Sequence, residues 1–359
     1  QTATKMVTYI VIVAESIVYA VAVYGGPSEP FVLYVIIGQL MAASIIIMFL
    51  DELIQKGWGL GSGISLFIMA GVAQQILWSM FSPLPAGDGG MIGIIPYIIE
   101  SLTGSGDLGN VLFRSNQLPS IFGLCLTAGI ILILVFTQGM KIEIPIVSTK
   151  YRGFQAVYPI KMMYVSNIPV ILASALTANA VFVFQMIWSN FNPRNNNFFV
   201  NFIAQFDPTS PSTPVGGLIY YVTPPRGLDV AALDPMRGVG YVLFMIGIVV
   251  VFGKLWVELG GLSPKSAAQN LLDADVQIPG FRRSNKPVEA LLNKYIPSVT
   301  IIGSCILGLL AGVSDVLGVF GSGIGVLLMV DIMINYYTQL VREQVEVVMP
   351  RLGALLGRK

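Results

Sequence analysis

The sequence predicts an all-α fold that crosses a lipid bilayer about eight times, and three observations support this. Apolar residues make up 55% of the 359 residues and charged residues only 11%, and the mean hydropathy is +0.76. Soluble domains are about one quarter charged. Eight apolar stretches come close to or exceed the roughly 20 residues that cross a bilayer. Basic residues are also distributed unevenly between the segments that connect those stretches.

The apolar stretches alternate with connecting segments, which must therefore lie on alternate sides of the membrane. Of the 20 Lys and Arg residues, all but four fall on the side of the N-terminus. By the positive-inside rule, that side is cytosolic, and so is the C-terminus. The four exceptions are Arg114, Arg194, Arg226 and Arg237. The eight stretches cover residues 6–24, 31–50, 60–81, 119–140, 162–190, 239–257, 296–314 and 321–341.

Composition also limits the chemistry available to the chain. It contains no histidine, and its two cysteines, Cys125 and Cys305, lie within apolar stretches. Catalysis by Ser-His-Asp or Cys-His groups and zinc or haem sites with His ligands are therefore excluded. No phosphate-binding loop of the Walker type is present. We expect a protein that is not an enzyme and that requires no cofactor or metal.

Few acidic side chains interrupt the apolar stretches. Glu15 lies in the middle of the first one, where a carboxylate is costly unless it is paired, protonated or facing water. It could line a wet path, or it could be protonated and bonded to a neighbouring helix. Asp331 and Asn335 share one face of the last stretch, which suits hydrogen bonding between helices. A proton pump would need a chain of carboxylates, which these residues do not form.

Two segments on the cytosolic side, 141–161 and 254–295, carry many of the basic residues. These charges could serve only as topology signals, or they could form a docking surface for an acidic or polyanionic partner. The length of the second segment favours docking. On the other side, 82–118 and 191–237 are rich in Gly, Pro, Ser and Asn. Within them, Met91–Leu102 is typical of an interfacial amphipathic helix, and Asn190–Asn197 is typical of turns.

A short motif occurs twice. The tetrapeptide GSGI begins the third stretch at Gly61 and the eighth at Gly321. The expected topology gives these two helices opposite directions, as an inverted repeat requires, although a chance match is also compatible with so glycine-rich a chain. If the motifs are equivalent, the repeat contains five helices. Two further helices are then expected before Gln1, which makes ten in all.

Five strings in order along the chain resemble the SecY family, the large subunit of the protein-conducting channel. They are Gly61–Ile68, Lys150–Gly153, Tyr158–Leu172, Gly280–Arg282 and Val326–Leu328. The resemblance covers essentially the whole chain, from the family's third helix to its C-terminus, and its details are more archaeal than bacterial. It implies a bundle of two five-helix halves related by an inverted pseudo-twofold axis. On that basis residues 1–82 would complete the N-terminal half, 83–118 form an external segment, 119–345 form the C-terminal half, and 346–359 form a cytosolic tail.

The resemblance also implies a function and its residues. The family conducts unfolded polypeptides through a ring of aliphatic side chains and releases hydrophobic segments sideways into lipid. The ring positions that match are Ile64, Ile68, Ile171 and Leu328, and the polar gate positions are Glu15 and Asn167. The ribosome would dock on Lys150, Arg152, Lys265, Arg282 and Arg283. Further implied partners are the SecE (gamma) and beta-type small subunits, signal peptides, nascent chains and membrane lipid, but not DNA.

A multi-pass protein of the plasma membrane with a cytosolic C-terminus follows from this interpretation. The alternative is a secondary transporter with inverted repeats, which should show broken helices around a polar site at the membrane midplane. The matched central positions are aliphatic instead. An intramembrane enzyme is a weaker alternative, because the chain has neither histidine nor a paired-aspartate motif.

Overall fold

The computed structural model describes residues 2–24, 30–57, 62–86, 90–103, 111–114, 118–148, 155–165, 167–208, 213–225, 227–273, 276–277 and 285–348. It divides into two compact units. Unit 1 comprises Gln1–Gly71, Ala178–Tyr220 and Ile332–Lys359, and unit 2 comprises Val72–Thr177 and Tyr221–Asp331. Each unit therefore combines segments from both of the expected halves, and the expected domain boundaries stay a prediction.

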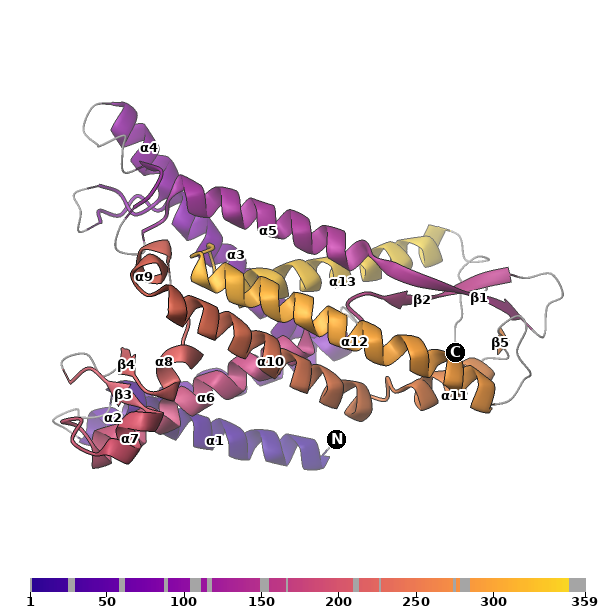
Figure 1. Ribbon diagram of the computed structural model, residues 1–359, viewed down its shortest axis with the longest axis horizontal. Helices are drawn as coiled ribbons and strands as arrows, with labels where there is room; N and C mark the ends of the chain where they lie inside the picture. The colour runs from indigo at the N-terminus through magenta and orange to yellow at the C-terminus, as the bar shows by residue number, and fades with distance from the viewer. Residues whose placement is uncertain are drawn as a thin grey trace. The chain divides into compact units, whose positions relative to one another are not determined.

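A long helix corresponds to each of the eight expected spans, with differences at the boundaries (Figure 1). Within the described residues, seven stretches are long and apolar enough to cross a membrane, and they account for each of these helices except α1. The fold class is confirmed, and the exact count of eight stays a prediction. The helices are α1 (Thr2–Tyr24), α2 (Pro30–Gly57), α3 (Gly63–Phe81), α5 (Ile121–Gly139), α6 (Ile168–Phe191), α10 (Pro235–Leu259), α12 (Asn285–Val316) and α13 (Gly323–Val348).

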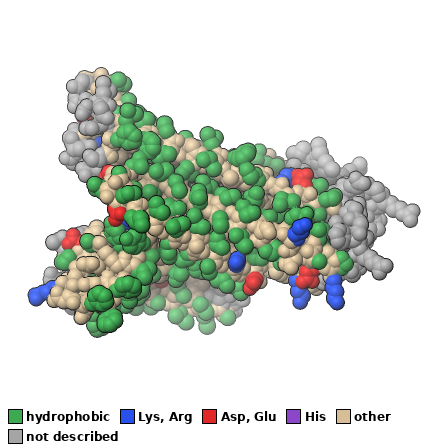
Figure 2. Space-filling model, viewed as in Figure 1, with side chains coloured by type: hydrophobic (Ala, Val, Ile, Leu, Met, Phe, Trp, Pro, Cys, Tyr) green, Lys and Arg blue, Asp and Glu red, His purple; other side chains and the backbone are tan. Residues whose placement is uncertain are grey.

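Apolar side chains cover the outer surfaces of the helices in unit 2. Figure 2 shows hydrophobic side chains along the central lengths of α5, α10 and α12. Phe136 on α5 is 69% exposed and Leu243 on α10 is 63% exposed. Such surfaces are unfavourable in water over this extent but are normal in lipid, where the backbone groups are already paired within each helix.

Local sequence explains where several of these helices begin. Ser120 caps α5 by accepting a hydrogen bond from the Gly123 N–H at 3.2 Å. Asp234 caps α10 in the same way for the Arg237 N–H, with Pro235 as the first helical residue. Both are standard helix starts, since a side-chain oxygen satisfies an N–H that has no partner within the helix.

In unit 1, α1 and α2 pack against each other as neighbours in sequence and space. Lys5 and Lys56 both bind the carboxylate of Glu52, and the Lys5 Nζ lies 2.7 Å from Glu52 Oε1. The start of α1 and the end of α2 therefore lie at the same end of this pair. This agrees with the assignment of Lys5 and Lys56 to one side of the membrane.

In unit 2, α10 and α12 run side by side and form its most extensive helix contact (Figure 1). Small residues permit it. A Cβ atom added to Gly308 of α12 would lie 2.7 Å from the Ile246 Cα atom of α10. Close approach at glycine is a common way for helices to pack in membranes, because lipid provides no hydrophobic driving force between helices.

The described parts of the two basic segments, 141–161 and 254–295, form strands and helices. Strands β1 (Lys141–Ser148) and β2 (Gln155–Lys161) form an antiparallel hairpin, and β5 (Val276–Gln277) pairs with the other edge of β1. Helix α11 (Pro264–Asp273) follows α10. The expected start of the fifth span at residue 162 was wrong. Strand β2 runs to Lys161, and α6 begins only after Asn167, whose carbonyl accepts the N–H groups of Val170 and Ile171.

The connections on the other side contain short elements. The expected amphipathic segment forms α4 (Ile94–Leu102), with Ile94, Tyr97 and Ser101 buried on one face. The Asn-rich turn is also present: Asn195 adopts a positive φ of 55° and accepts the Trp188 indole N–H at 2.7 Å. The other elements are α7 (Phe198–Ile203), β3 (Gln205–Phe206), β4 (Pro214–Gly216), α8 (Leu218–Val222) and α9 (Leu228–Leu233).

Candidate functional site

Two of the predicted ring residues belong to unit 2. Ile171 lies in the first turn of α6 and is 37% exposed, while Leu328 lies in the second turn of α13 and is 8% exposed. A hydrogen bond joins the two helix starts: the Asn167 Nδ2 donates to the Leu327 carbonyl at 3.1 Å. The residue next to Leu328 is therefore tied to the turn that carries Ile171.

The other two ring residues belong to unit 1 and lie at the start of α3. Ile64 is 45% exposed, and Ile68 follows it by one helical turn. The Ile64 N–H donates to Asp51 Oδ1 at 3.0 Å. Because the two pairs of residues fall in different units, the ring of four stays a prediction.

The structure places the two predicted gate residues in different environments. Glu15 is exposed on α1 in unit 1. Asn167 is only 2% exposed in unit 2, where its Nδ2 bonds to α13. Its Oδ1 is buried without a hydrogen-bond partner among the described residues. Asn167 therefore holds helix starts together within unit 2, and its pairing with Glu15 across a gate stays a prediction.

A contact between α1 and α6 was missed by the sequence analysis. The rings of Tyr19 and Phe182 meet edge to face, with centroids 5.6 Å apart and planes at 71°. Glu15 precedes Tyr19 by four residues, and Asn179 precedes Phe182 by three. Each polar residue therefore lies one turn from an aromatic partner on the same helix face. The spacing of polar and aromatic residues was a usable signal, but only the fold shows which two helices meet.

The described parts of the two basic segments share one hydrophobic core within unit 2. Ile144 and Ile160 come from the hairpin, Ala268 from α11, and Leu292 and Ile296 from the start of α12. The Tyr164 hydroxyl also donates to the Leu262 carbonyl at 2.9 Å. Figure 2 shows Lys, Arg, Asp and Glu side chains near this end of the helices, and further charged side chains at the opposite end. The described parts of the two segments that were predicted to dock a partner therefore form one folded body.

Two tyrosines extend this core with neutral hydroxyl groups. Burial raises the pKa of Tyr164 to about 12, and the neighbouring Tyr158 adds to the rise. Burial also raises the pKa of Tyr158. Both side chains are therefore uncharged at neutral pH, and the positive charge of this region comes from its Lys and Arg residues.

The predicted docking residues are only partly described. Lys265 is exposed on α11. Lys150, Arg152, Arg282 and Arg283 lie outside the described residues, and so does most of the expected tail 346–359. Their role in docking stays a prediction from the sequence.

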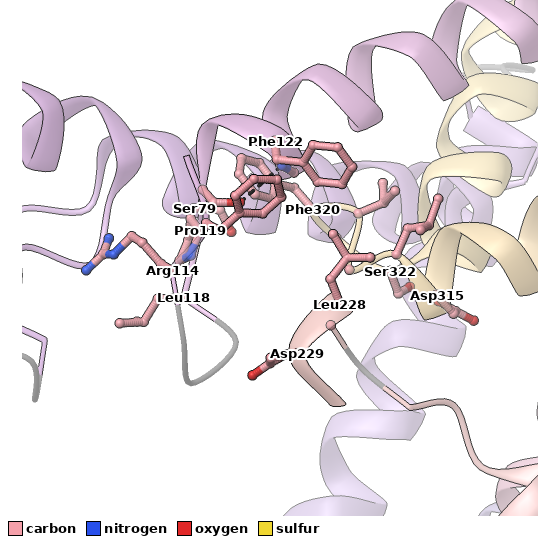
Figure 3. Close-up of a pocket in the computed structure, with 18 of the residues that line it drawn as sticks. Ser79, Arg114, Leu118, Pro119, Phe122, Leu228, Asp229, Asp315, Phe320 and Ser322 are labelled. Atoms are coloured by element: carbon pink, nitrogen blue, oxygen red, sulfur yellow. Dashed lines mark hydrogen bonds between the residues drawn. The ribbon is translucent and has the colours of Figure 1, made fainter. Parts of the chain in front are cut away.

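A cavity of about 810 Å³ lies in unit 2, between the ends of α3 and α5 and the chain around α9 and the start of α13. Figure 3 shows Phe122 and Phe320 beside it, with Arg114, Asp229 and Asp315 among the polar lining residues. The Thr127 hydroxyl accepts the Phe320 N–H at 3.1 Å. This mixed lining is not characteristic of one class of ligand. Over the described ranges, no three Cys, Asp or Glu side chains converge as a metal site would need.

Comparison with known protein families gives one family for nearly the whole chain. The SecY family model matches residues 1–337.

Solved structures agree with that match. A structure of a protein-conducting channel is 33% identical, with a TM-score of 0.78, and covers 96% of this chain and 73% of its own. A SecY structure concerned with the plug domain that stabilises the closed channel is 33% identical, with a TM-score of 0.77 and coverages of 96% and 74%. Canine Sec61, in a ribosome–channel complex, is 32% identical, with a TM-score of 0.74 and coverages of 96% and 73%.

Proposed function

This chain belongs to the SecY family, and we infer from that membership that it is the pore-forming subunit of a protein translocase. The observation that carries this conclusion is its likeness, over 96% of its length, to a solved protein-conducting channel. The transporter alternative is not favoured. A translocation channel supplies a path rather than catalysis, which suits a chain without histidine.

The pore would conduct a polypeptide by contacting it loosely with aliphatic side chains. Ile64, Ile68, Ile171 and Leu328 present flexible aliphatic side chains, which can close around a polypeptide of any sequence without binding it. A narrow apolar constriction also excludes water and ions when it is empty. The same four side chains would therefore serve both as the passage for polypeptides and as the barrier to ions.

The test of this function is reconstitution of the full-length protein into sealed vesicles. We expect a secretory protein with a signal peptide to reach the lumen and become protected from added protease. The same protein without its signal peptide should remain accessible. Equal protection of both substrates, or of neither, would argue against a translocation channel.

Sideways release needs a seam between helices. In the family the seam lies between the second and third helices on one side and the seventh and eighth on the other, which implies that α1 faces α6 and α10 here. The Tyr19–Phe182 contact supports the pairing of α1 with α6. A segment of about 20 apolar residues that reaches such a seam is driven into lipid by its own hydrophobicity. Glu15 and Asn179, one turn from the aromatic pair, would give the seam a polar stretch beside the pore.

Replacing Tyr19 with Ala should ease lateral release. An edge-to-face aromatic pair is worth about 0.5–1.5 kcal/mol beyond its buried area, so the closed seam should lose about that much stability. We expect the variant to insert test segments that are less hydrophobic than those the wild type inserts. The apparent transfer free energy at which half of the segments enter the membrane should shift by about 1 kcal/mol. Tyr9→Ala, on the same helix, is the control. An unchanged insertion threshold alongside normal translocation would contradict this role.

We further propose that the folded body formed by β1, β2, β5, α11 and the start of α12 docks the ribosome. Canine Sec61 was solved in a complex with a ribosome. Basic side chains on such a surface can bind ribosomal RNA phosphates and release their counterions. The small SecE (gamma) and beta-type subunits, the plasma membrane, a cytosolic C-terminus and an archaeal origin belong to the same proposal.

Reversing the charge of Arg282 and Arg283 to Glu should weaken ribosome binding. Each lost phosphate contact lowers both the affinity and its dependence on salt. We expect co-sedimentation with ribosomes to fall about tenfold or more at low salt, and the slope against salt concentration to become shallower. Arg194→Glu, exposed on the other side of the membrane, is the matched control. Equal effects of the two changes would contradict specific docking.

A further inference from the structure

Helix α3 begins against an aspartate of the preceding helix. Asp51 Oδ1 accepts the Ile64 N–H at 3.0 Å and the Ser62 hydroxyl at 3.2 Å. Its Oδ2 accepts the side-chain amide of Gln55 at 2.7 Å. A Cβ atom added to Gly63 would lie 2.9 Å from the Asp51 Cα atom, so a glycine at the helix start brings the two backbones together.

Helix α13 also begins against an aspartate of the preceding helix, but there the carboxylate binds the first helical residue, whereas Asp51 binds the second. Asp315, near the end of α12, accepts the Gly323 N–H at 2.6 Å through Oδ1 and the Tyr241 hydroxyl at 2.9 Å through Oδ2. A Cβ atom added to Gly323 would lie 2.8 Å from the Asp315 nitrogen. The Ser322 hydroxyl also accepts the Gly325 N–H at 3.1 Å. The carboxylate is 7% exposed and lines the cavity.

The two helix starts use the same residues of the repeated GSGI motif. In each copy the serine precedes the helix and its carbonyl accepts the first helical bond, from Leu66 in one case and Val326 in the other. The second glycine of each motif is the first helical residue. Counting five residues from that glycine reaches Ile68 in α3 and Leu328 in α13. Both are proposed ring residues.

The proposed ring makes the caps necessary. Five residues of α-helix rise about 7.5 Å, so each ring residue stands that far from its helix start. A ring residue near the middle of the roughly 30 Å hydrocarbon core therefore puts the start of its own helix about 7.5 Å from that middle, well inside the core. The first-turn N–H groups would then lie at membrane depth, where an unpaired backbone group is costly.

We propose that Asp51 and Asp315 are equivalent positioning residues, each of which anchors the recessed start of a pore helix and thereby sets the place of that helix's ring side chain. This proposal rests on the proposed function. A carboxylate suits the task because it accepts several N–H or O–H donors and is stabilised by the positive end of the helix dipole.

The test compares Asp51→Ala and Asp315→Ala with Asp51→Asn and Asp315→Asn in the reconstituted full-length channel. The Ala variants lose the acceptor oxygen. We expect their ion leak to rise about three- to tenfold, which is the scale of a lost helix cap. We also expect them to export substrates that carry weakened signal peptides. The Asn variants keep an acceptor oxygen and should stay near the wild-type leak. Gly63→Ala, which retains the carboxylate but pushes it from the helix start, should leak like Asp51→Ala.

Matched controls separate anchoring from loss of charge. Glu52→Ala removes the neighbouring acid of α2, which binds Lys5 and Lys56 rather than the start of α3. Asp229→Ala removes another acid of the cavity lining. Both should keep the wild-type leak. Wild-type leak in both Asp→Ala variants would overturn the proposal, and so would equal leak in the Asn and Ala variants. A wild-type protein that translocates nothing would instead refute the proposed function.

Discussion

Replacing Ile171 or Leu328 with Asn is expected to break the seal of the resting channel. An amide carries water into a constriction that excludes ions only while it is apolar. Placing a polar group in such a site changes its free energy by about 1–3 kcal/mol, and each 1.4 kcal/mol is a factor of ten. Ion flux through reconstituted vesicles should therefore rise about tenfold, and defective signal peptides should be accepted more readily.

The neighbouring Leu172 provides the control for this experiment. It is 39% exposed, much like Ile171 at 37%, but one residue along a helix turns the side chain by about 100°. Leu172→Asn should leave ion flux near the wild-type value. If flux and signal-peptide selection were both unchanged in Ile171→Asn and Leu328→Asn, these residues would not belong to the pore.

Replacing Gly308 with Val should destabilise unit 2 strongly. The added Cβ would lie 2.7 Å from the Ile246 Cα atom and 3.0 Å from the Met245 carbonyl oxygen, and neither backbone atom can move independently of α10. Overpacking of this kind costs about 1–3 kcal/mol or more. We expect the free energy of unfolding in detergent to fall by about 3 kcal/mol, with a clear loss of thermal stability.

Gly247 offers a matched substitution on α10 itself. A Cβ atom added there meets nothing within 4 Å, so Gly247→Val should cost no stability through packing, and none through helix propensity, because Val is a better helix former than Gly. If the free energy of unfolding fell by a similar amount in both variants, close packing between α10 and α12 at Gly308 would not explain the effect of Gly308→Val.

The membrane-spanning helices could be predicted from the sequence because hydrophobic length alone defines them. The fold of the two basic segments, 141–161 and 254–295, could be predicted less fully. Ile142 and Ile144 alternate with Lys141 and Glu143 in the manner of a strand, but two basic stretches more than 90 residues apart gave no sign that they share a core. The start of α6 was also mispredicted, because the apolar run before it continues through a turn and gives no sign of the helix boundary at Asn167.

The residues of the candidate site also differ in how far the sequence could predict them. The aliphatic ring positions could be predicted only through the family resemblance, since nothing in an aliphatic helix distinguishes a side chain that faces the pore from one that faces lipid, and they stay a prediction. Asp51 and Asp315 were missed because each stands near the end of one helix and acts on the next, at 11 residues from Ser62 in one case and 8 from Gly323 in the other. Because the two aspartates stand at different distances from their GSGI motifs, aligning the motifs does not align Asp51 with Asp315. Their similar role is visible only in the hydrogen bonds.

The core that the β1–β2 hairpin shares with α11 and α12 has a mechanical consequence. Strand β2 leads through a short turn into α6, and the buried face of α12 continues from Leu292 and Ile296 into the membrane helix. The hairpin is therefore connected stiffly to the first turn of α6 and to α12. If a partner docks on this body as proposed, a displacement of the body is transmitted to α6 and α12 rather than absorbed in their connections.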